Sequence, residues 1–213
     1  EIQLMIQILV AEQQADVEAL LTGSGVSAAD LSHPAFRLTT DQEMLLYTRI
    51  AKLNTDPALS LRVGCKLGLA NYGILGFGMM SAHSLRDAVQ LIADFSPLIS
   101  WASSNRLARE TINGERFYKL EIDPSAGDND TVILEMGSTF ASLERVFSDI
   151  LNVSTHFHRI DLRYSRSDKA HQLYCDFFDC PVFFDQPSYA VWFKESTLNQ
   201  LLPHAQPRYA SLM

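Results

Sequence analysis

Histidine and cysteine side chains of the kind that bind zinc gather in the last third of the sequence. Two of them, His171 and Cys175, are four residues apart and would share one face of a helix. The sequence contains no Cys-x-x-Cys or His-Glu-x-x-His pattern. We therefore predict no metal and no cofactor, but two interpretations stay open: a metal site, or buried cysteines beside strand-end histidines. The group consists of His156, His158, His171, Cys175 and Cys180.

A second candidate is the uncharged, glycine-rich stretch GLANYGILGFGMMSA, which runs from Gly68 to Ala82. A Walker loop requires Gly-Lys-Ser/Thr, and a dinucleotide fingerprint requires a third glycine where Ser81 stands, so nucleotide binding is not predicted. The stretch is also shorter than the roughly 20 apolar residues of a transmembrane helix. It either packs in the core or forms a pocket wall. The wall would consist of Tyr72, Phe77, Met79 and Met80.

The clearest local signal is a β-hairpin over residues 106–122. Two alternating runs, RLARETI and ERFYKLEI, flank Asn113 and Gly114, which tolerate the positive φ of a type I′ turn. A two-residue turn fixes which residues face each other across the hairpin. It places Thr111 opposite Arg116, Arg109 opposite Tyr118 and Leu107 opposite Leu120, all on one side.

Arg109 is the charged residue best suited to bind a ligand, because the hairpin alternation places it on the predicted core face. A buried guanidinium is costly unless it is paired. Arg109 therefore either meets an internal carboxylate such as Glu135 or Glu144, or receives the acidic group of a ligand. Arg37, Arg106 and Trp101 are weaker candidates of the same kind. The predicted ligand-binding residues are Tyr72, Phe77, Met79, Met80, Trp101, Arg109 and Tyr118.

Helical patterns dominate the first hundred residues. Residues 43–53 place Leu46, Tyr47, Ile50 and Leu53 on one helical face. Asp56 and Pro57 are suited to begin the next helix, as N-cap and first helical residue. Ser84 and Asp87 have the spacing of a capping box before a helix that Pro97 stops. The apolar segment before Ser84 is expected to be a glycine-rich turn.

Strand patterns follow the helices and indicate an α+β fold with a mostly antiparallel sheet. After the hairpin, a long helix is expected to begin at an Asp130 cap, with its apolar stripe on Val132, Met136, Phe140, Leu143 and Phe147. The alternation of residues 156–164 predicts a strand that puts Ile160, Leu162 and Tyr164 on the face of His156 and His158. Further strands are predicted near 182–184 and 189–193, and helices near 171–178 and 195–202.

The composition is typical of a compact soluble protein: 213 residues, 47% hydrophobic and 20% charged. The formal net charge of −8 argues against direct binding to nucleic acid or to an acidic membrane, because neutralising phosphates requires excess Lys and Arg. Three cysteines cannot all pair within the chain, which indicates a reducing cytoplasm. The sequence begins at Glu1 without Met and ends on PRYASLM, and we expect it to be part of a longer protein.

Three segments together resemble the N-terminal effector-binding, arabinose-binding-like domain of AraC-type transcription regulators. They follow the order and approximate spacing of that family, and the resemblance extends over nearly the whole chain. The middle one, a glycine-rich apolar turn followed by Ser-Leu-Arg-Asp-Ala, is the most informative. The segments are TDPALSLRVG, GILGFGMMSAHSLRDAVQLIADFSPLIS and FFDCPVFFDQPSYAVWFKESTLNQLLP.

The resemblance implies a bacterial, cytoplasmic regulator in which residues 1–213 form a single effector-binding and dimerisation domain. Two helix-turn-helix motifs that read DNA are then expected after Met213, so DNA is a partner only through that missing part. The expected partners of the chain itself are a small-molecule effector and a second copy, with no membrane. Family members respond to diverse small molecules, so the resemblance does not identify the effector.

Two alternatives remain at this point. The chain is a dimerisation module whose apolar stretch is only core, or a small-molecule enzyme without a recognisable motif. No Gly-x-Ser-x-Gly elbow, catalytic-loop motif or distinctive carboxylate pair occurs in the sequence. We therefore predict that the protein is not an enzyme.

Overall fold

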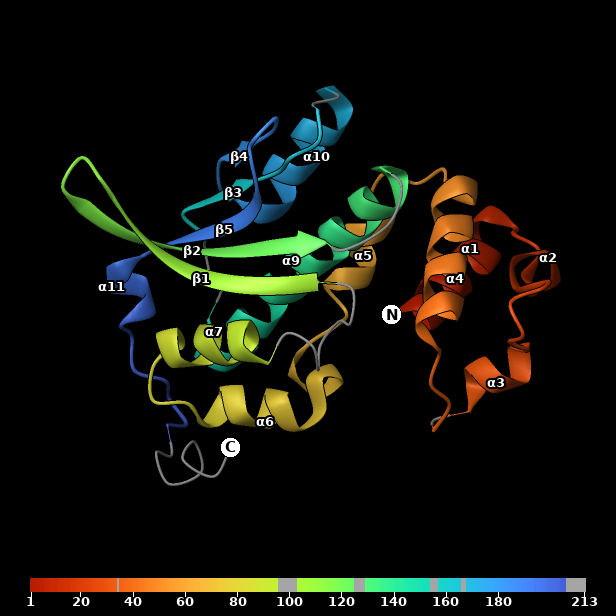
Figure 1. Cartoon of the computed structure of the whole chain (residues 1–213), viewed down its shortest axis with the longest axis horizontal. Coiled ribbons are helices and arrows are strands. Elements are labelled where there is room, and N and C mark those ends of the chain that lie inside the picture. Colours follow the sequence, from red (N-terminus) through yellow and green to blue (C-terminus); the bar gives the residue numbers. More distant parts are fainter. Residues whose placement is uncertain (34, 96–102, 125–128, 154–156, 166–167, 206–213) are drawn as a thin grey trace.

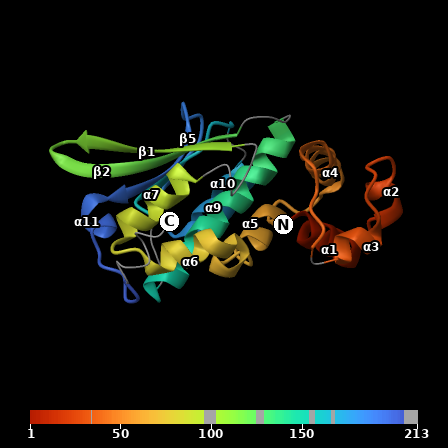
Figure 2. The same cartoon turned by 60° about the horizontal axis from the view of Figure 1, so that its bottom comes forward.

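The computed structural model describes residues 1–33, 35–95, 103–124, 129–153, 157–165 and 168–205. It has the predicted α+β architecture, with helices packed against one face of a five-stranded sheet (Figure 1). Helices α6 (Gly73–Ser81), α7 (Leu85–Asp94) and α9 (Asn129–Leu151) lie on the same side of the sheet (Figure 2). The helices from α1 (Ile2–Gln13) to α4 (Thr40–Leu53) form a separate group at one end of the molecule (Figure 2). No helix in the described ranges is long and apolar enough to cross a membrane.

The N-terminal group of helices has its own hydrophobic core. Helix α4 begins with a capping box between Thr39 and Gln42 and buries Leu46, Tyr47 and Ile50, as predicted. The prediction for Leu53 was wrong: it is 50% exposed because it ends the helix, beyond the packed face. The group consists of α1 (Ile2–Gln13), α2 (Val17–Leu21), α3 (Ala28–Ser32) and α4 (Thr40–Leu53).

Four helical segments connect this group to the sheet. The predicted capping box of Ser84 and Asp87 is confirmed. The helix expected at Asp56 begins two residues late, at Leu59, and a turn precedes it in which the Asp56 carboxylate accepts from the Ala58 N–H and the Asp56 carbonyl accepts from the Leu59 N–H. The glycine-rich segment is a helix and not a turn, since burial of Leu75 and Met79 outweighs the low helix propensity of glycine. These segments are α5 (Leu59–Gly64), η1 (Leu69–Tyr72), α6 (Gly73–Ser81) and α7 (Leu85–Asp94).

The sheet has the strand order β1-β2-β5-β3-β4, in which only β3 and β4 are parallel. The predicted hairpin turn is confirmed, since Asn113 and Gly114 have φ values of 52° and 83°. The predicted register is also confirmed, with Arg109 opposite Tyr118. The strands are β1 (Ser103–Ile112), β2 (Glu115–Pro124), β3 (Arg159–Asp161), β4 (Val182–Phe183) and β5 (Tyr189–Lys194).

The strand predicted over residues 156–164 is shorter than its alternation suggests. Ile160, Leu162 and Tyr164 are buried as expected. His158 is exposed, and its ring lies 4.6 Å from that of Phe117, on the face of the sheet opposite to the main core. The chain bends at His158, so the alternation begins only at β3. His156 lies outside the described residues.

Three helices complete the described fold: α9 (Asn129–Leu151), α10 (Asp168–Phe178) and α11 (Glu195–Leu198). Helix α9 buries its predicted stripe against the core beneath the sheet, except that Val132 is only partly buried. The helix begins at Asn129, so Asp130 lies in its first turn and is not its cap. Helix α11 is shorter than predicted because the following backbone leaves it to pair with the start of α7. The Leu85 N–H donates to the Gln200 carbonyl, and the Leu202 N–H donates to the His83 carbonyl.

The two hydrophobic cores meet where α5 packs on α9. Leu59 and Val63 of α5 enter the N-terminal core, whereas Leu61 enters the core beneath the sheet. Glycines permit the close approach of the helices. A Cβ on Gly64 would lie less than 3.0 Å from the Ser138 carbonyl oxygen, and one on Gly137 would lie as close to the Ser60 hydroxyl.

Substituting Gly64 by alanine is expected to destabilise the protein by about 2 kcal/mol. The added methyl group meets backbone of α9, so one helix must shift, and this cost exceeds the roughly 1 kcal/mol gain in helix propensity. Urea unfolding of Gly64→Ala and of the wild type measures this difference in the free energy of unfolding. Thr139→Ala, on a partly exposed position of α9, is the control with a small expected effect. Wild-type stability of Gly64→Ala would contradict the proposed close packing.

Glu135 of α9 gives the stability a pH dependence of its own. Burial, with the charges of Glu1 and Glu43, raises the pKa of the Glu135 carboxyl from 4.5 to about 7. The folded state therefore holds a proton that the unfolded chain has released, and stability falls as the pH rises between these two values. Glu135→Gln should remove this loss and be more stable than the wild type by up to ~3 kcal/mol above pH 7. Urea unfolding at pH 5, 6, 7 and 8 tests this, and a pH-independent difference would contradict it.

Candidate functional site

The residues predicted to line a pocket in the glycine-rich segment lie in different surroundings. Met79 is completely buried in the main core, whereas Phe77 is 53% exposed and Met80 is half-buried. Tyr72 packs against the same core, with its hydroxyl 2.7 Å from that of Ser142, and burial raises its pKa to about 12. Trp101 lies outside the described residues. That these side chains bind a ligand stays a prediction.

Arg109 lies on the predicted side of the hairpin but is not buried. Its side chain is 52% exposed, because the hairpin extends past the helices that cover Leu107 and Leu120 (Figure 1). The predicted internal carboxylate partner is present, but it belongs to Glu195, whose Oε1 lies 3.8 Å from Nη2 of Arg109, and not to Glu135 or Glu144.

Two more arginines contact Glu195. We call Glu195 with Arg86, Arg109 and Arg116 the Glu195 cluster. Arg116 Nε lies 2.6 Å from Oε2 of Glu195, and an Arg86 Nη atom lies 3.8 Å from its Oε1. Arg86 also donates to the Asn199 side-chain carbonyl and lies 4.7 Å from the ring centre of Tyr118. The carboxylate is only 15% exposed. The cluster therefore ties α7, the hairpin and α11 together.

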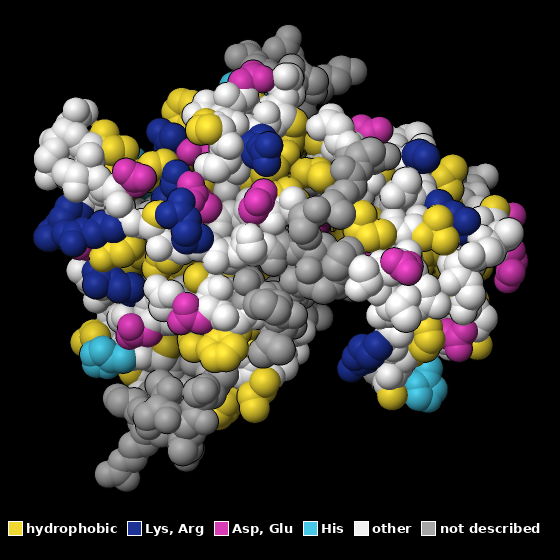
Figure 3. Space-filling model, in the orientation of Figure 1, with side chains coloured by type: hydrophobic (Ala, Val, Ile, Leu, Met, Phe, Trp, Pro, Cys, Tyr) yellow, Lys and Arg dark blue, Asp and Glu magenta, His cyan; other side chains and the backbone are white. Residues whose placement is uncertain are grey.

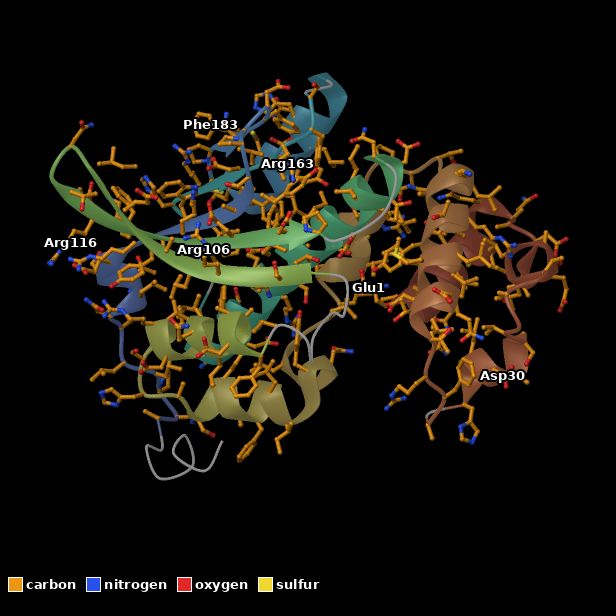
Figure 4. All side chains as sticks on the ribbon, in the orientation of Figure 1. Glu1, Asp30, Arg106, Arg116, Arg163 and Phe183 are labelled. Atoms are coloured by element: carbon orange, nitrogen blue, oxygen red, sulfur yellow. The ribbon has the colours of Figure 1, made fainter. Side chains whose placement is uncertain are left out.

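A groove of about 430 Å³ opens at the other end of the hairpin, where β1 starts, β2 ends and β5 begins. We call it the rim groove. Its volume lies within the range of small-molecule sites. Figure 4 labels two of its arginines, Arg106 from β1 and Arg163 from the segment after β3. The lining residues are Ser104, Arg106, Glu121, Ile122, Asp123, Arg163, Pro187, Ser188 and Tyr189.

The rim groove carries two guanidinium groups and two carboxylates. Arg106 contacts Glu121, whose Oε1 also lies 2.5 Å from the Lys119 ammonium. Burial alone would raise the pKa of the Glu121 carboxyl, but Lys119 and then Arg106 lower it below its ordinary value. A ligand therefore meets Glu121 as a charged, already paired group.

The other pair in the rim groove is looser and more accessible. Arg163 Nη1 lies 3.7 Å from the Asp123 carboxylate, and both side chains are more than half exposed. The Arg163 guanidinium lies 5.7 Å from the ring centre of Tyr189, which gives it a flat apolar surface to pack against. Since exposed ion pairs contribute little, a ligand can replace Asp123 at small cost. The arrangement is suited to binding a polar molecule.

The outer face of the sheet continues this pattern of charges and aromatic rings. Lys and Arg side chains gather over the strands with Asp and Glu among them (Figure 3). Trp192 Nε1 donates to the Asp161 carboxylate over 2.6 Å, and Arg159 approaches the same carboxylate at 2.8 Å while stacking on the Trp192 ring. These contacts hold the strands next to the rim groove in place.

A second groove, of about 470 Å³, lies among the N-terminal helices. Arg37, a weaker candidate from the sequence, is on its wall. The lining residues are Glu1, Ile2, Gln3, Leu31, Ser32, His33, Phe36, Arg37, Leu38 and Glu43.

The histidines and cysteines of the last third do not gather around one point within the described residues, where no three His, Cys, Asp or Glu side chains could hold a metal ion. Burial raises the pKa of the Cys180 thiol to about 12, so it is protonated at neutral pH. His171 lies beside the ring of Phe184, with 5.5 Å between ring centres. His156 is outside the part of the chain that the structure describes.

Sequence reasoning named Arg106 only as a weaker candidate and missed Arg163 and Tyr189. The hairpin register places Arg106 directly opposite Glu121, and the register was predictable. No local signal places Arg163 and Tyr189 beside them, because this depends on β5 pairing with β2 across a long sequence separation.

The sequence matches one family model, described as the arabinose-binding domain of AraC transcription regulator, N-term, over residues 15–202. No curated protein matched the sequence. The fold is similar to that of a crystal structure of the transcriptional regulator CdpR from Pseudomonas aeruginosa, with a TM-score of 0.69 and 17% sequence identity. The match covers 98% of this chain and 59% of that one, so the chain spans less than two thirds of that protein. At this identity the likeness shows the fold alone.

Removal of the Glu195 carboxylate should cost more stability than removal of any one arginine around it. Glu195→Ala leaves three guanidinium groups without their shared partner and is expected to cost ~1–2 kcal/mol, allowing for their exposure to solvent. Arg109→Ala breaks one exposed 3.8 Å pair and should cost less than ~0.5 kcal/mol. Urea unfolding compares them, with Glu115→Ala, which removes an exposed pair with Lys194, as the control. An Arg109→Ala protein that fails to fold would contradict this assignment.

Proposed function

Because the chain belongs to the family of N-terminal arabinose-binding domains of AraC transcription regulators, we propose that it is the small-molecule-sensing part of such a regulator. The observation that carries this proposal is the rim groove. All of its lining residues fall within residues 15–202, which match the family model. The groove among the N-terminal helices is a weaker candidate, since Glu1, Ile2 and Gln3 of its wall lie outside that match.

The charges of the rim groove suggest the class of effector. Arg163 and Arg106 offer a guanidinium fork to an acidic group, and Asp123 lies where it accepts from a basic or hydroxyl group of the same molecule. The effector that fits is therefore a compact metabolite with both an acidic and a basic group, such as an amino acid or a derivative of one. The family name is not evidence that the effector is arabinose.

The regulatory mechanism we propose is a population shift. An effector that binds one conformation of the sensor better than another changes the arrangement of the DNA-reading domains by no more than its differential affinity. In this proposal residues 1–213 act as one unit, and the helix-turn-helix motifs follow them in the full protein. The net charge of −8 is consistent with a sensor that does not itself contact DNA. The regulator would act in the cytoplasm as a homodimer.

Two other functions compete with sensing. A dimerisation module would form dimers but would gain no stability from any metabolite. An enzyme would turn over the molecule that binds in the rim groove, so incubation of protein with a bound compound, followed by analysis of that compound, separates an enzyme from a sensor. We favour the sensor, because the family is described as a ligand-binding domain of a transcription regulator.

Screening amino acids and related metabolites by thermal shift is the direct test. A ligand that binds only the folded state should add about 2.7 kcal/mol of stability at one hundred times its dissociation constant. Arg163→Ala should weaken the affinity for that ligand at least tenfold, because a hydrogen bond to a charged group contributes ~1.5–3 kcal/mol.

The matched control for this test is Arg145→Ala. Arg145 is likewise about half exposed and paired with an aspartate, Asp149, but lies on α9 and not in the rim groove. The Arg145→Ala variant should bind the ligand with the affinity of the wild type. If no compound stabilises the protein, sensing is the wrong function. If one does but Arg163→Ala binds it normally, the effector binds elsewhere.

A further inference from the structure

Strand β1 is a long and regular strand at the edge of the sheet. It has ten residues, contains neither proline nor glycine, and pairs with β2 without a bulge from Ser103 to Ile112. Natural edge strands are usually short, bulged or interrupted by proline, because an open edge invites pairing with another chain. β1 has none of these three protections.

The backbone groups on the open side of β1 belong to alternate residues. In a two-residue hairpin the residues flanking the turn bond to each other, so Ile112 and every second residue before it face β2. The N–H and C=O groups of the residues between them point away from β2. In the described part of the chain, β1 makes no backbone–backbone hydrogen bond outside its pairing with β2. The outward-facing residues are Ser103, Asn105, Leu107, Arg109 and Thr111.

The charge pattern of β1 is complementary to itself. Arg106 and Glu110 lie at equal distances on either side of Ala108, and both are exposed. When two copies of β1 pair antiparallel about a two-fold axis at Ala108, Arg106 faces Glu110 of the partner subunit on both sides of the axis. The small side chain of Ala108 then meets its own copy at the axis. The outward-facing backbone groups match in this register, since Leu107 faces Arg109 of the partner subunit.

Neighbouring registers lack this complementarity. A two-fold axis at Arg109, Arg106 or Glu110 places the side chain at the axis directly against its own charge, which is unfavourable across strands. An axis at Leu107 pairs Arg106 with Ala108 and Glu110 with Ser104, and so leaves both charges without an opposite. Of these registers, only the one with its axis at Ala108 places an opposite charge across from both Arg106 and Glu110.

We propose that β1 is an interface between two copies of this chain, which pair antiparallel about Ala108 and join their sheets into one. Opposite Ser104, at the rim groove, this pairing places Ile112 of the partner subunit. Ile112 is 41% exposed in the single chain, and the pairing covers it. The groove of one subunit then lies next to the hairpin tip of the other. The proposal rests on the edge strand and its charges and does not require that the rim groove bind an effector.

Charge reversal of the 1–213 chain tests the interface. In Arg106→Glu each subunit presents two acidic groups, and in Glu110→Arg two basic groups, so two attractive contacts per dimer become repulsive. Each variant should weaken the dimer at least tenfold, measured by sedimentation equilibrium. An equimolar mixture of the two variants restores both opposite-charge contacts and should form heterodimers with near wild-type affinity. The double variant Arg106→Glu/Glu110→Arg should likewise recover dimerisation.

The mixture separates assembly from folding. Arg106 also contacts Glu121 within its own chain, so Arg106→Glu loses some stability whether or not the interface exists. That loss persists in the mixture and in the double variant, and it cannot produce recovery. Arg145→Glu, a reversal on α9, is the control that should dimerise normally.

Three results would overturn the proposal. One is a wild-type chain that stays monomeric at all concentrations, and another is a dimer that neither reversal weakens, which would place the contact on a different surface. The third is that both reversals weaken the dimer but their mixture does not restore it, which would exclude the register about Ala108.

Discussion

The close contact between α5 and α9 is the constraint on which the arrangement of the molecule depends. Leu59 and Val63 of α5 enter one hydrophobic core and Leu61 enters the other, so a six-residue helix belongs to both. This is possible only if the helix lies nearly in contact with the backbone of α9, which the absence of a side chain at Gly64 and Gly137 permits. The N-terminal helices are thereby held to the long helix that supports the sheet, and a shift of α5 moves one core relative to the other.

The inner and outer faces of the sheet have different roles. Its inner face buries Leu120, Val191 and Ile160 against the helices, so that face is committed to stability. Its outer face has no helix of the described chain over it in Figure 1, and it carries Trp192, Arg159 and Asp161 in a network of stacking and hydrogen bonds. The part of the sheet that no described helix covers in Figure 1 therefore comprises the outer face, the rim and the edge. Both the rim groove and the open side of β1 lie in this part.

The sequence predicted those features that local patterns determine. The Asn113-Gly114 turn sets the hairpin register, and Ser84 with Asp87 sets the start of α7, because each depends on residues within a few positions. The sequence-based predictions failed where elements far apart in the sequence determine how a side chain is placed. The exposure of Arg109 follows from how far the helices extend beneath the hairpin, and its partner Glu195 comes from the start of α11, directly after β5. Whether Tyr72, Phe77, Met79, Met80, Trp101, Arg109 and Tyr118 bind a ligand remains a prediction.

Arg106 is the residue through which the two proposals are connected. It contacts Glu121 inside its own hairpin, lines the rim groove, and stands on the outer face of the edge strand opposite the position assigned to Glu110 of the partner subunit. An effector that forms an ion pair with the Arg106 guanidinium removes the attraction between Arg106 and Glu110 of the partner subunit. An effector that binds beside Arg106 without pairing with it keeps that attraction and adds contacts with the partner's Ile112. In either case linkage requires that the effector change self-association by the same factor by which self-association changes effector affinity. A sensor built in this way needs no distant pathway between its groove and its dimer, because one side chain belongs to both.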